Sequence, residues 1–202
     1  GPDTVIVTVC DASVPALCTT DTIFINVITG PIVANENASG VTGTPITGNV
    51  LTNDGPAGAT VGSTVDNPNN GTITITPGTG GFTYTPNPGF SGYDTVIVQV
   101  CFNSACVNDT IFITVNPDIN NETITVTSGT SSTGTIGTND SGTGLTYGTT
   151  PVSGPNNGII TIGTNGTYTY TPNNGYTGPD TVIVTVCDAS VPALCTTDTI
   201  FI

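Results

Sequence analysis

A perfect internal duplication constrains this chain more than any other feature. Residues 1–25, GPDTVIVTVCDASVPALCTTDTIFI, recur without change as residues 178–202. A diverged copy lies between them, because GYDTVIVQVC at 92–101 matches the start of the same segment. Self-similarity of this kind is the signature of a repeat architecture, so the sequence predicts a string of similar modules.

The repeats also predict where the modules begin and end. We expect residues 1–29 to be the C-terminal hairpin of a preceding, truncated module. Residues 30–116 and 117–202 would then be two complete modules, the second of which ends in the duplicated hairpin. A chain that starts with a copy of its own end is typical of a window on a longer array. Whether that array is one very long chain or polymerised subunits that exchange strands stays open at this point.

Short alternating runs bounded by Gly, Pro and Asn indicate an all-β fold. Val5, Val7 and Val9 alternate with Thr and Ile, which predicts a strand with its valines facing a core. In the middle copy we expect Ile111 and Ile113 to face inward and Phe112 outward. About seven short strands per module fit tandem immunoglobulin-like β-sandwiches.

The same register turns three aspartates towards the core. Asp21, Asp109 and Asp198 would lie opposite valines on the preceding strand. Either a β-bulge redirects the strand there, or these carboxylates accept backbone hydrogen bonds. Both explanations remain open from the residues alone.

Asn-Gly pairs supply the expected turns. Asn165-Gly166 separates two alternating runs and predicts a hairpin. Asn70-Gly71 and Asn157-Gly158 are likewise expected to provide the positive φ values of tight turns.

Six cysteines fall in three closely spaced pairs, each between two alternating runs. The spacing predicts a cross-strand disulfide at the tip of every final hairpin, with free or intermolecular thiols as the competing arrangement. The predicted pairs are Cys10 with Cys18, Cys101 with Cys106, and Cys187 with Cys195. Disulfides of this kind are typical of an oxidising compartment, which favours an extracellular or cell-surface location.

The composition excludes several classes of function. The chain has no Lys, Arg or His and a formal net charge of −14. It therefore lacks a histidine base, a lysine Schiff base and any cationic clamp for an oxyanion or phosphate. Nucleic acid is not an expected partner, because phosphate binding depends on Lys and Arg. No apolar run is long enough to span a membrane. We expect a protein that is not an enzyme.

One long motif resembles a known family. GNVLTND at 48–54, NGTITI at 70–75 and GGFTYTPNPGFSGYDTVIVQVC at 80–101 are similar to bacterial cadherin-like and Ig-like tandem repeats. This resemblance covers nearly all of both modules. It implies large secreted surface proteins of the Bacteroidota type, often adhesins or extracellular filaments.

Polar residues at the module junctions suggest a calcium site. Oxygen ligands there suit Ca²⁺, which stiffens the junctions of cadherins; the alternative is an ordinary polar linker. The candidate ligands are Asp118, Asn120, Asn121 and Glu122 at one junction and Asn35 and Glu36 at the other. No other cofactor is expected.

Asp-Thr-aliphatic triplets occur six times and resemble the O-glycosylation acceptor of Bacteroidota. The alternative is that Asp-Thr simply begins a strand. The candidate acceptors are Thr4, Thr22, Thr95, Thr110, Thr181 and Thr199.

These observations predict a structural repeat segment of an extracellular filament or adhesin stalk, whose partners are neighbouring repeats or copies of itself. The alternative is an adhesive module that recognises glycans or another surface, with or without calcium. Such a site needs exposed aromatic side chains, and Phe102 at a hairpin tip is the candidate.

Overall fold

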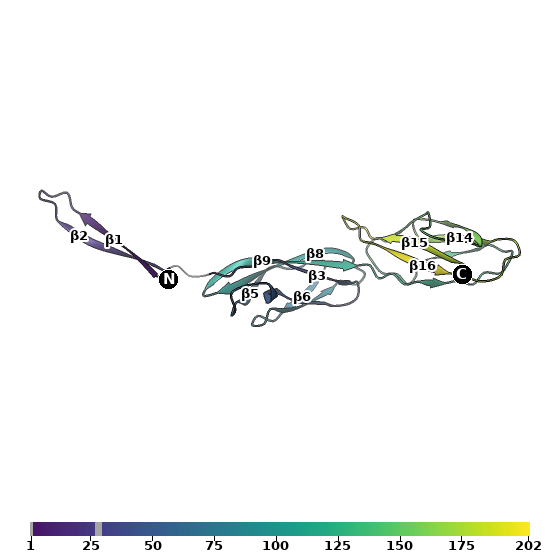
Figure 1. Cartoon of the computed structure of the whole chain (residues 1–202), viewed down its shortest axis with the longest axis horizontal. Coiled ribbons are helices and arrows are strands. Elements are labelled where there is room, and N and C mark those ends of the chain that lie inside the picture. Colours follow the sequence, from purple (N-terminus) through teal and green to yellow (C-terminus); the bar gives the residue numbers. More distant parts are fainter. Residues whose placement is uncertain (1, 27–29) are drawn as a thin grey trace.

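The computed structural model describes residues 2–26 and 30–202, which form a hairpin and two β-sandwiches (Figure 1). The sandwiches follow one another end to end, and the hairpin stands apart from both. Gly1 and residues 27–29 of the predicted first segment lie outside the described residues. This is the all-β, tandem-sandwich architecture that the alternating runs predict.

The hairpin consists of β1 (Pro2–Cys10) and β2 (Cys18–Asn26). The two strands are antiparallel, with Cys10 opposite Cys18 and Val7 opposite Asp21. Within the described ranges they form a two-stranded sheet of their own.

The first sandwich combines a four-stranded sheet, in the order β3-β9-β8-β5, with a three-stranded sheet, β4-β7-β6. Its first strand runs parallel to its last, and the other pairs are antiparallel. The elements are β3 (Glu36–Val41), β4 (Ile46–Asn49), the short 3-10 helix η1 (Val50–Thr52), β5 (Thr60–Asp66), β6 (Gly71–Ile75), β7 (Gly81–Pro86), β8 (Gly92–Phe102) and β9 (Ala105–Asn116).

The second sandwich repeats this topology, with the sheets β10-β16-β15-β12 and β11-β14-β13. Again the first strand is parallel to the last. The elements are β10 (Glu122–Thr123), β11 (Ser132–Thr135), β12 (Thr146–Tyr147), β13 (Gly158–Ile162), β14 (Thr167–Pro172), β15 (Thr181–Cys187) and β16 (Cys195–Phe201).

Alternation along the strands builds each core. In the first sandwich Val98 and Ile111 are fully buried, whereas Phe112 is 43% exposed, as predicted. Val98 and Ile111 pack in one core with Phe82 and Tyr84 of the opposite sheet. In the second sandwich the valines of β15 and the tyrosines of β14 form an equivalent cluster. Each sandwich therefore has its own hydrophobic core.

Two of the three Asn-Gly predictions are wrong about the backbone. Gly166 has a φ of 81° in the turn between β13 and β14, as expected. Gly71 and Gly158 do not have a positive φ, and each is the first residue of a strand. A tyrosine ring lies over each of them, and a Cβ would come within 2.6 Å of the ring of Tyr84 or Tyr170. Glycine is needed there for close packing, not for turn geometry.

No helix within the described residues is long and apolar enough to cross a lipid bilayer.

Candidate functional site

Asp109 and Asp198 are the first parts of the candidate site. Both side chains are fully buried, opposite Val98 and Val184, as the strand register predicts. The pairing of β8 with β9 is continuous through Asp109, so no bulge redirects the strand. One oxygen of Asp109 accepts a hydrogen bond of 2.8 Å from the Thr110 N–H. Both carboxylates face other carboxylates.

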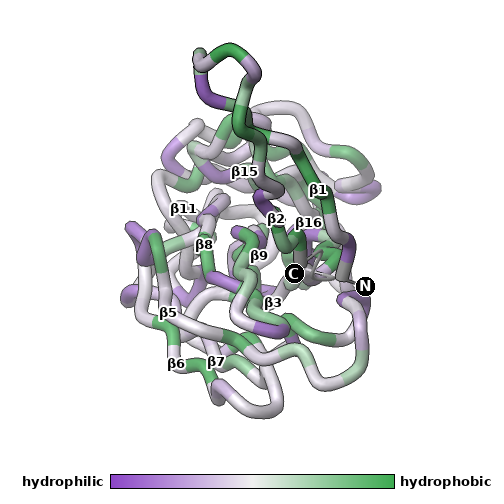
Figure 2. Tube along the Cα trace, turned by 90° about the vertical axis from the view of Figure 1, so that its left-hand side faces the viewer, coloured by the Kyte–Doolittle hydropathy of each residue, from purple (hydrophilic) through white to green (hydrophobic). Residues whose placement is uncertain are grey.

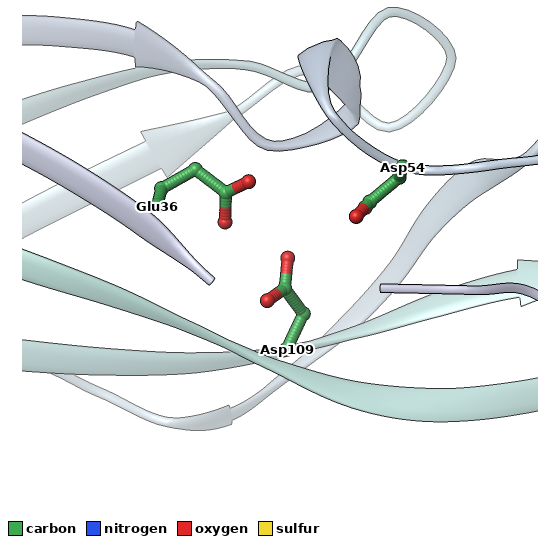
Figure 3. A group of neighbouring side chains, drawn as sticks. All are labelled: Glu36, Asp54 and Asp109. Carbon is green, nitrogen blue, oxygen red and sulfur yellow. The ribbon is translucent and has the colours of Figure 1, made fainter. Parts of the chain in front are cut away.

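Glu36, Asp54 and Asp109 form a carboxylate cluster in the first sandwich. Figure 3 shows their side chains converging from three different segments, and one oxygen of each lies within 4.8 Å of the others. Glu36 begins β3, Asp54 follows η1 and Asp109 belongs to β9. We call this set the first cluster.

The second sandwich holds an equivalent set, which we call the second cluster. Glu122 of β10, Asp140 and Asp198 of β16 bring one oxygen each within the same 4.8 Å. Asp140 accepts hydrogen bonds of 2.8 Å from the Asn120 N–H and from the Tyr147 hydroxyl. Glu122 accepts one of 3.0 Å from the Gly137 N–H. The two clusters therefore lie at matching places in the repeated topology.

The electrostatics of both clusters are unfavourable without a positive charge. Burial, together with the neighbouring Asp109 and Asp54 carboxyl groups, raises the pKa of Glu36 to about 9. Burial and the nearby Glu122 and Asp140 carboxyl groups raise the pKa of Asp198 to about 8. The sequence has no Lys, Arg or His that could form an ion pair with them. Such clusters can hold a hard metal ion or must take up protons.

The residues expected at the junctions divide into two groups. Glu36 and Glu122 belong to the clusters, whereas the other four form hydrogen bonds with backbone groups. The Asn35 and Asn121 side chains accept from the Thr110 and Thr199 N–H groups. The Asn120 side chain donates to the Asn139 carbonyl, and Asp118 forms a backbone bridge with Ser141.

Four cluster members were missing from the predicted ligand set: Asp54, Asp109, Asp140 and Asp198. A signal for two of them is present in the sequence. The spacing between Glu36 and Asp54 equals that between Glu122 and Asp140, and both aspartates follow an asparagine. Matching acidic positions between the two modules would have revealed the pattern.

A tyrosine and an aspartate form a second repeated arrangement. The hydroxyls of Tyr84 and Tyr170 each donate a 2.9 Å hydrogen bond, to Asp94 and Asp180 respectively. Two further N–H groups, of Asn156 and its neighbour Asn157, donate to Asp180. Burial alone would raise the pKa of Asp180, but these bonds hold that pKa below its usual value. Tyr84 and Asp94, which lie in the family-like segment at 80–101, therefore have a structural role, as do Tyr170 and Asp180 in the second sandwich.

The hairpin tips are closed by disulfides, Cys10–Cys18, Cys101–Cys106 and Cys187–Cys195. One tip also contacts the neighbouring sandwich. Ser91 of the first sandwich donates a 2.8 Å hydrogen bond to Asp188, which follows Cys187, and its N–H donates to the Thr143 hydroxyl. Both Ser91 and Asp188 are buried at this junction.

The remaining candidates differ in exposure. Thr4, Thr22, Thr95 and Thr181 are exposed, and Thr110 and Thr199 are half-buried. Phe102 is also half-buried, and a Cβ on Gly58 would lie 3.7 Å from its ring. It is therefore not a freely exposed aromatic platform.

Among the described residues, nothing covers the hairpin β1–β2 as its copy is covered. Val7 is 37% and Val9 52% exposed, whereas the corresponding Val184 and Val186 are fully buried. Figure 2, which views the molecule from the hairpin end, shows hydrophobic residues along β1. Asp21 occupies the position of Asp198 but has no companion glutamate within the hairpin.

Comparison with solved structures gives matches of low identity. An endo-fucoidan hydrolase of glycoside hydrolase family 107 is 15% identical, with a TM-score of 0.36, over 98% of this chain and 33% of that one. The protocadherin gamma B4 extracellular domain is 14% identical, with a TM-score of 0.32, over 99% and 39%. A SusE-like surface-located polysaccharide-binding protein from the Bacteroides thetaiotaomicron heparin utilisation locus is 15% identical, with a TM-score of 0.32, over 86% and 34%.

This chain thus spans between a third and two fifths of the length of these solved chains. A search of curated proteins found no significant match. The model of the bacterial Ig domain family matches the sequence twice, over residues 29–116 and 114–202. Together with the repeated sandwich topology, this match shows that the chain belongs to the bacterial Ig domain family.

Proposed function

We propose that this chain is a structural repeat segment of an extracellular filament or adhesin stalk, with no catalytic role. One observation carries the proposal: the hairpin β1–β2 repeats the sequence of β15–β16, and no described residue covers its apolar face. Its function would be to close a module whose other strands resemble residues 117–177.

The register of the two hairpins supports this role. Val7 pairs with Asp21 as Val184 pairs with Asp198, and the disulfide pairs correspond as well. In the second sandwich, residues 117–177 supply the strands that bury β15 and β16. The same hairpin sequence carries the same buried pattern, so it fits the same set of strands.

Two aspartates of the hairpin also lack the partners of their copies. Asp3 corresponds to Asp180, yet its carboxylate accepts only from the Thr4 N–H among the described residues. Asp180 accepts in addition from Tyr170 of the covering strands. Within the described part of the chain, Asp21 likewise lacks the glutamate and aspartate that surround Asp198. A covering module of the 117–177 type would supply both sets of partners.

We favour covering strands that precede the hairpin in one continuous array over strands donated by a second copy. In a second copy, the site for the hairpin is already filled by that copy's own β15–β16, which has the same sequence. A tethered hairpin acts at an effective concentration of about millimolar, so it outcompetes an identical free one.

The composition supports an exposed structural role. Three disulfides suit an oxidising exterior. The absence of Lys and Arg leaves no site for trypsin-like proteases. The net charge of −14 keeps neighbouring arrays apart and soluble.

The test compares the chain with a version extended at its N-terminus by a copy of residues 117–177. We expect amide hydrogen exchange in β1 and β2 to slow by at least about 100-fold in the extended chain, because exchange would then require opening of a packed module. The control is an extension of the same composition in shuffled order. Equal exchange of the hairpin in all three chains would contradict the proposal.

The same material distinguishes the two assembly routes. Sedimentation of the unextended chain should show a monomer at micromolar concentration. A concentration-dependent dimer with a protected hairpin would show instead that a second copy provides the covering strands, and would overturn the continuous array.

A further inference from the structure

We propose that each sandwich binds one calcium ion between its three buried carboxylates, at Glu36, Asp54 and Asp109 in the first cluster and at Glu122, Asp140 and Asp198 in the second. The ion would join the first strand of each sandwich to its last strand and to the turn that follows the second strand.

The arrangement of the oxygens suits calcium. One oxygen of each carboxylate lies within 4.8 Å of the other two. Calcium takes oxygen ligands at about 2.3–2.6 Å, so two ligands on opposite sides of the ion are about 5 Å apart. The three carboxylates of the first cluster also point inward to a common centre (Figure 3).

Unpartnered oxygens are the second and independent observation. Asp109 and Asp198 are fully buried, and Glu36 is only 9% exposed. Across the described part of the chain, both Glu36 oxygens, both Asp198 oxygens and Oδ2 of Asp109 have no hydrogen-bond partner. A buried carboxylate oxygen without a partner is costly, and a cation would satisfy several at once.

The chain itself cannot supply the missing positive charge. It contains no Lys, Arg or His, so no side-chain ion pair can form at either cluster. All six cysteines are in disulfides, which removes thiolate ligands as well. Only oxygen donors remain, and oxygen donors select hard cations such as calcium over zinc or copper.

Calcium fits better than magnesium because of burial. Magnesium binds at about 2.0–2.1 Å with near-octahedral geometry and usually keeps several water molecules. A centre formed by three convergent, buried carboxylates favours the ion that accepts direct, irregular carboxylate coordination. A surface groove that includes Asn35, Glu36 and Asn53 among its lining residues offers a route from solvent to the first cluster.

The two clusters are not equivalent as ligands. In the first, Glu36 has two unpartnered oxygens and Asp54 and Asp109 have one each. In the second, Tyr147 and Asn120 already donate to the two oxygens of Asp140. Binding there competes with these hydrogen bonds, so the first cluster is expected to bind calcium more tightly.

The test titrates calcium into the full, metal-stripped chain by calorimetry. We expect two ions per chain, with the tighter site lost in Asp109→Asn and the weaker site lost in Asp198→Asn. The matched control is Asp66→Asn, which removes the same charge from an exposed carboxylate outside both clusters. It should keep both sites.

Thermal unfolding provides a readout that does not depend on binding heat. At about 100 times the dissociation constant, calcium should raise the unfolding midpoint of each sandwich by roughly 10 °C or more. In EDTA, Asp109→Asn should unfold at a temperature no lower than the parent, because it removes one of three repelling buried carboxylates. In calcium it should unfold at a lower temperature than the parent.

This reversal separates a lost ligand from a damaged fold. The proposal is overturned if calcium leaves both midpoints unchanged, or if Asp66→Asn loses as much calcium binding as Asp109→Asn. An equal effect of magnesium at the same concentration would overturn the assignment to calcium.

Discussion

The Ser91 hydroxyl donates a 2.8 Å hydrogen bond to the Asp188 carboxylate across the junction between the sandwiches. Ser91 also accepts from the Thr143 N–H at 2.9 Å. The serine is 2% and the aspartate 4% exposed, so water does not readily replace either bond. The side chain of Ser91, which immediately precedes β8, thus connects the first sandwich with two loops of the second.

Replacing this serine should loosen the junction without unfolding either sandwich. In Ser91→Ala, Asp188 keeps the bonds within its own loop but loses the one that crosses the junction. A cost of about 1–3 kcal/mol is typical when a buried group loses its partner. Hydrogen exchange at the Thr143 amide should therefore accelerate by about tenfold or more, whereas Ser63→Ala, at an exposed serine, should leave it unchanged. An unaltered rate in Ser91→Ala would show that the contact does not couple the domains.

The tyrosine hydroxyl at Asp180 should contribute measurably to stability. Tyr170→Phe keeps the ring but removes the donor to a buried carboxylate. We expect the second sandwich to lose about 1–3 kcal/mol of unfolding free energy in urea. Tyr93→Phe is the matched control, since Tyr93 is 42% exposed and should change little. Equal stability of the two variants would mean that water replaces the hydroxyl.

Acid should destabilise the second sandwich through Asp180. Burial opposes ionisation, but bonds from Asn156, Asn157, Tyr170 and Thr181 together lower the pKa of Asp180. Because the folded pKa lies below the unfolded value of about 3.9, ionised Asp180 stabilises the fold. That contribution is complete above about pH 4 and is lost as the pH falls through the folded pKa.

The measurement is the unfolding midpoint of the second sandwich between pH 5 and pH 2. Asp180→Asn should make the acid limb of this curve shallower, because the titrating group is gone. If the curves of unfolding midpoint against pH fell equally steeply in the parent and in Asp180→Asn, the acid sensitivity would belong to other carboxylates.

A methyl group at Gly71 should damage the first sandwich. The added Cβ would lie 2.6 Å from the Tyr84 ring and from the Thr85 carbonyl oxygen. Overpacking of this kind costs about 1–3 kcal/mol, so Gly71→Ala should lower the urea midpoint. Gly78→Ala is the control, because nothing lies within 4 Å of the place that its Cβ would occupy. The steric explanation would be wrong if Gly71→Ala were as stable as Gly78→Ala.

Much of the fold follows from local pattern. The alternation of Val and Ile identified the buried face of β8 and β9, because a strand has a side-chain period of two. The same register correctly predicted that Asp109 and Asp198 lie inside, opposite valines. Period and register are local properties, which is why residues alone were sufficient.

Which residue lies opposite a buried group depends on the tertiary structure, not on the local sequence. The Asn70-Gly71 pair has the composition of a turn, yet its glycine is required by a tyrosine on the neighbouring strand. Similarly, Glu36 and Asp109 meet only because β3 pairs with β9, which are far apart in sequence. Asn35 and Glu36 are adjacent in sequence, yet the carboxylates that surround Glu36 come from distant segments, so proximity in sequence does not identify its partners.

The parallel pairing of first and last strands has a mechanical consequence. When the first sandwich is stretched from its two ends, β3 and β9 are pulled in opposite directions along their length. The hydrogen bonds between them are then loaded in shear and must fail together. That ladder runs from Glu36 opposite Ile111 to Val41 opposite Asn116, whereas β10 and β16 share only two residue pairs. Under force the second sandwich should therefore yield before the first, and in the proposed filament it would act as the more extensible of the two.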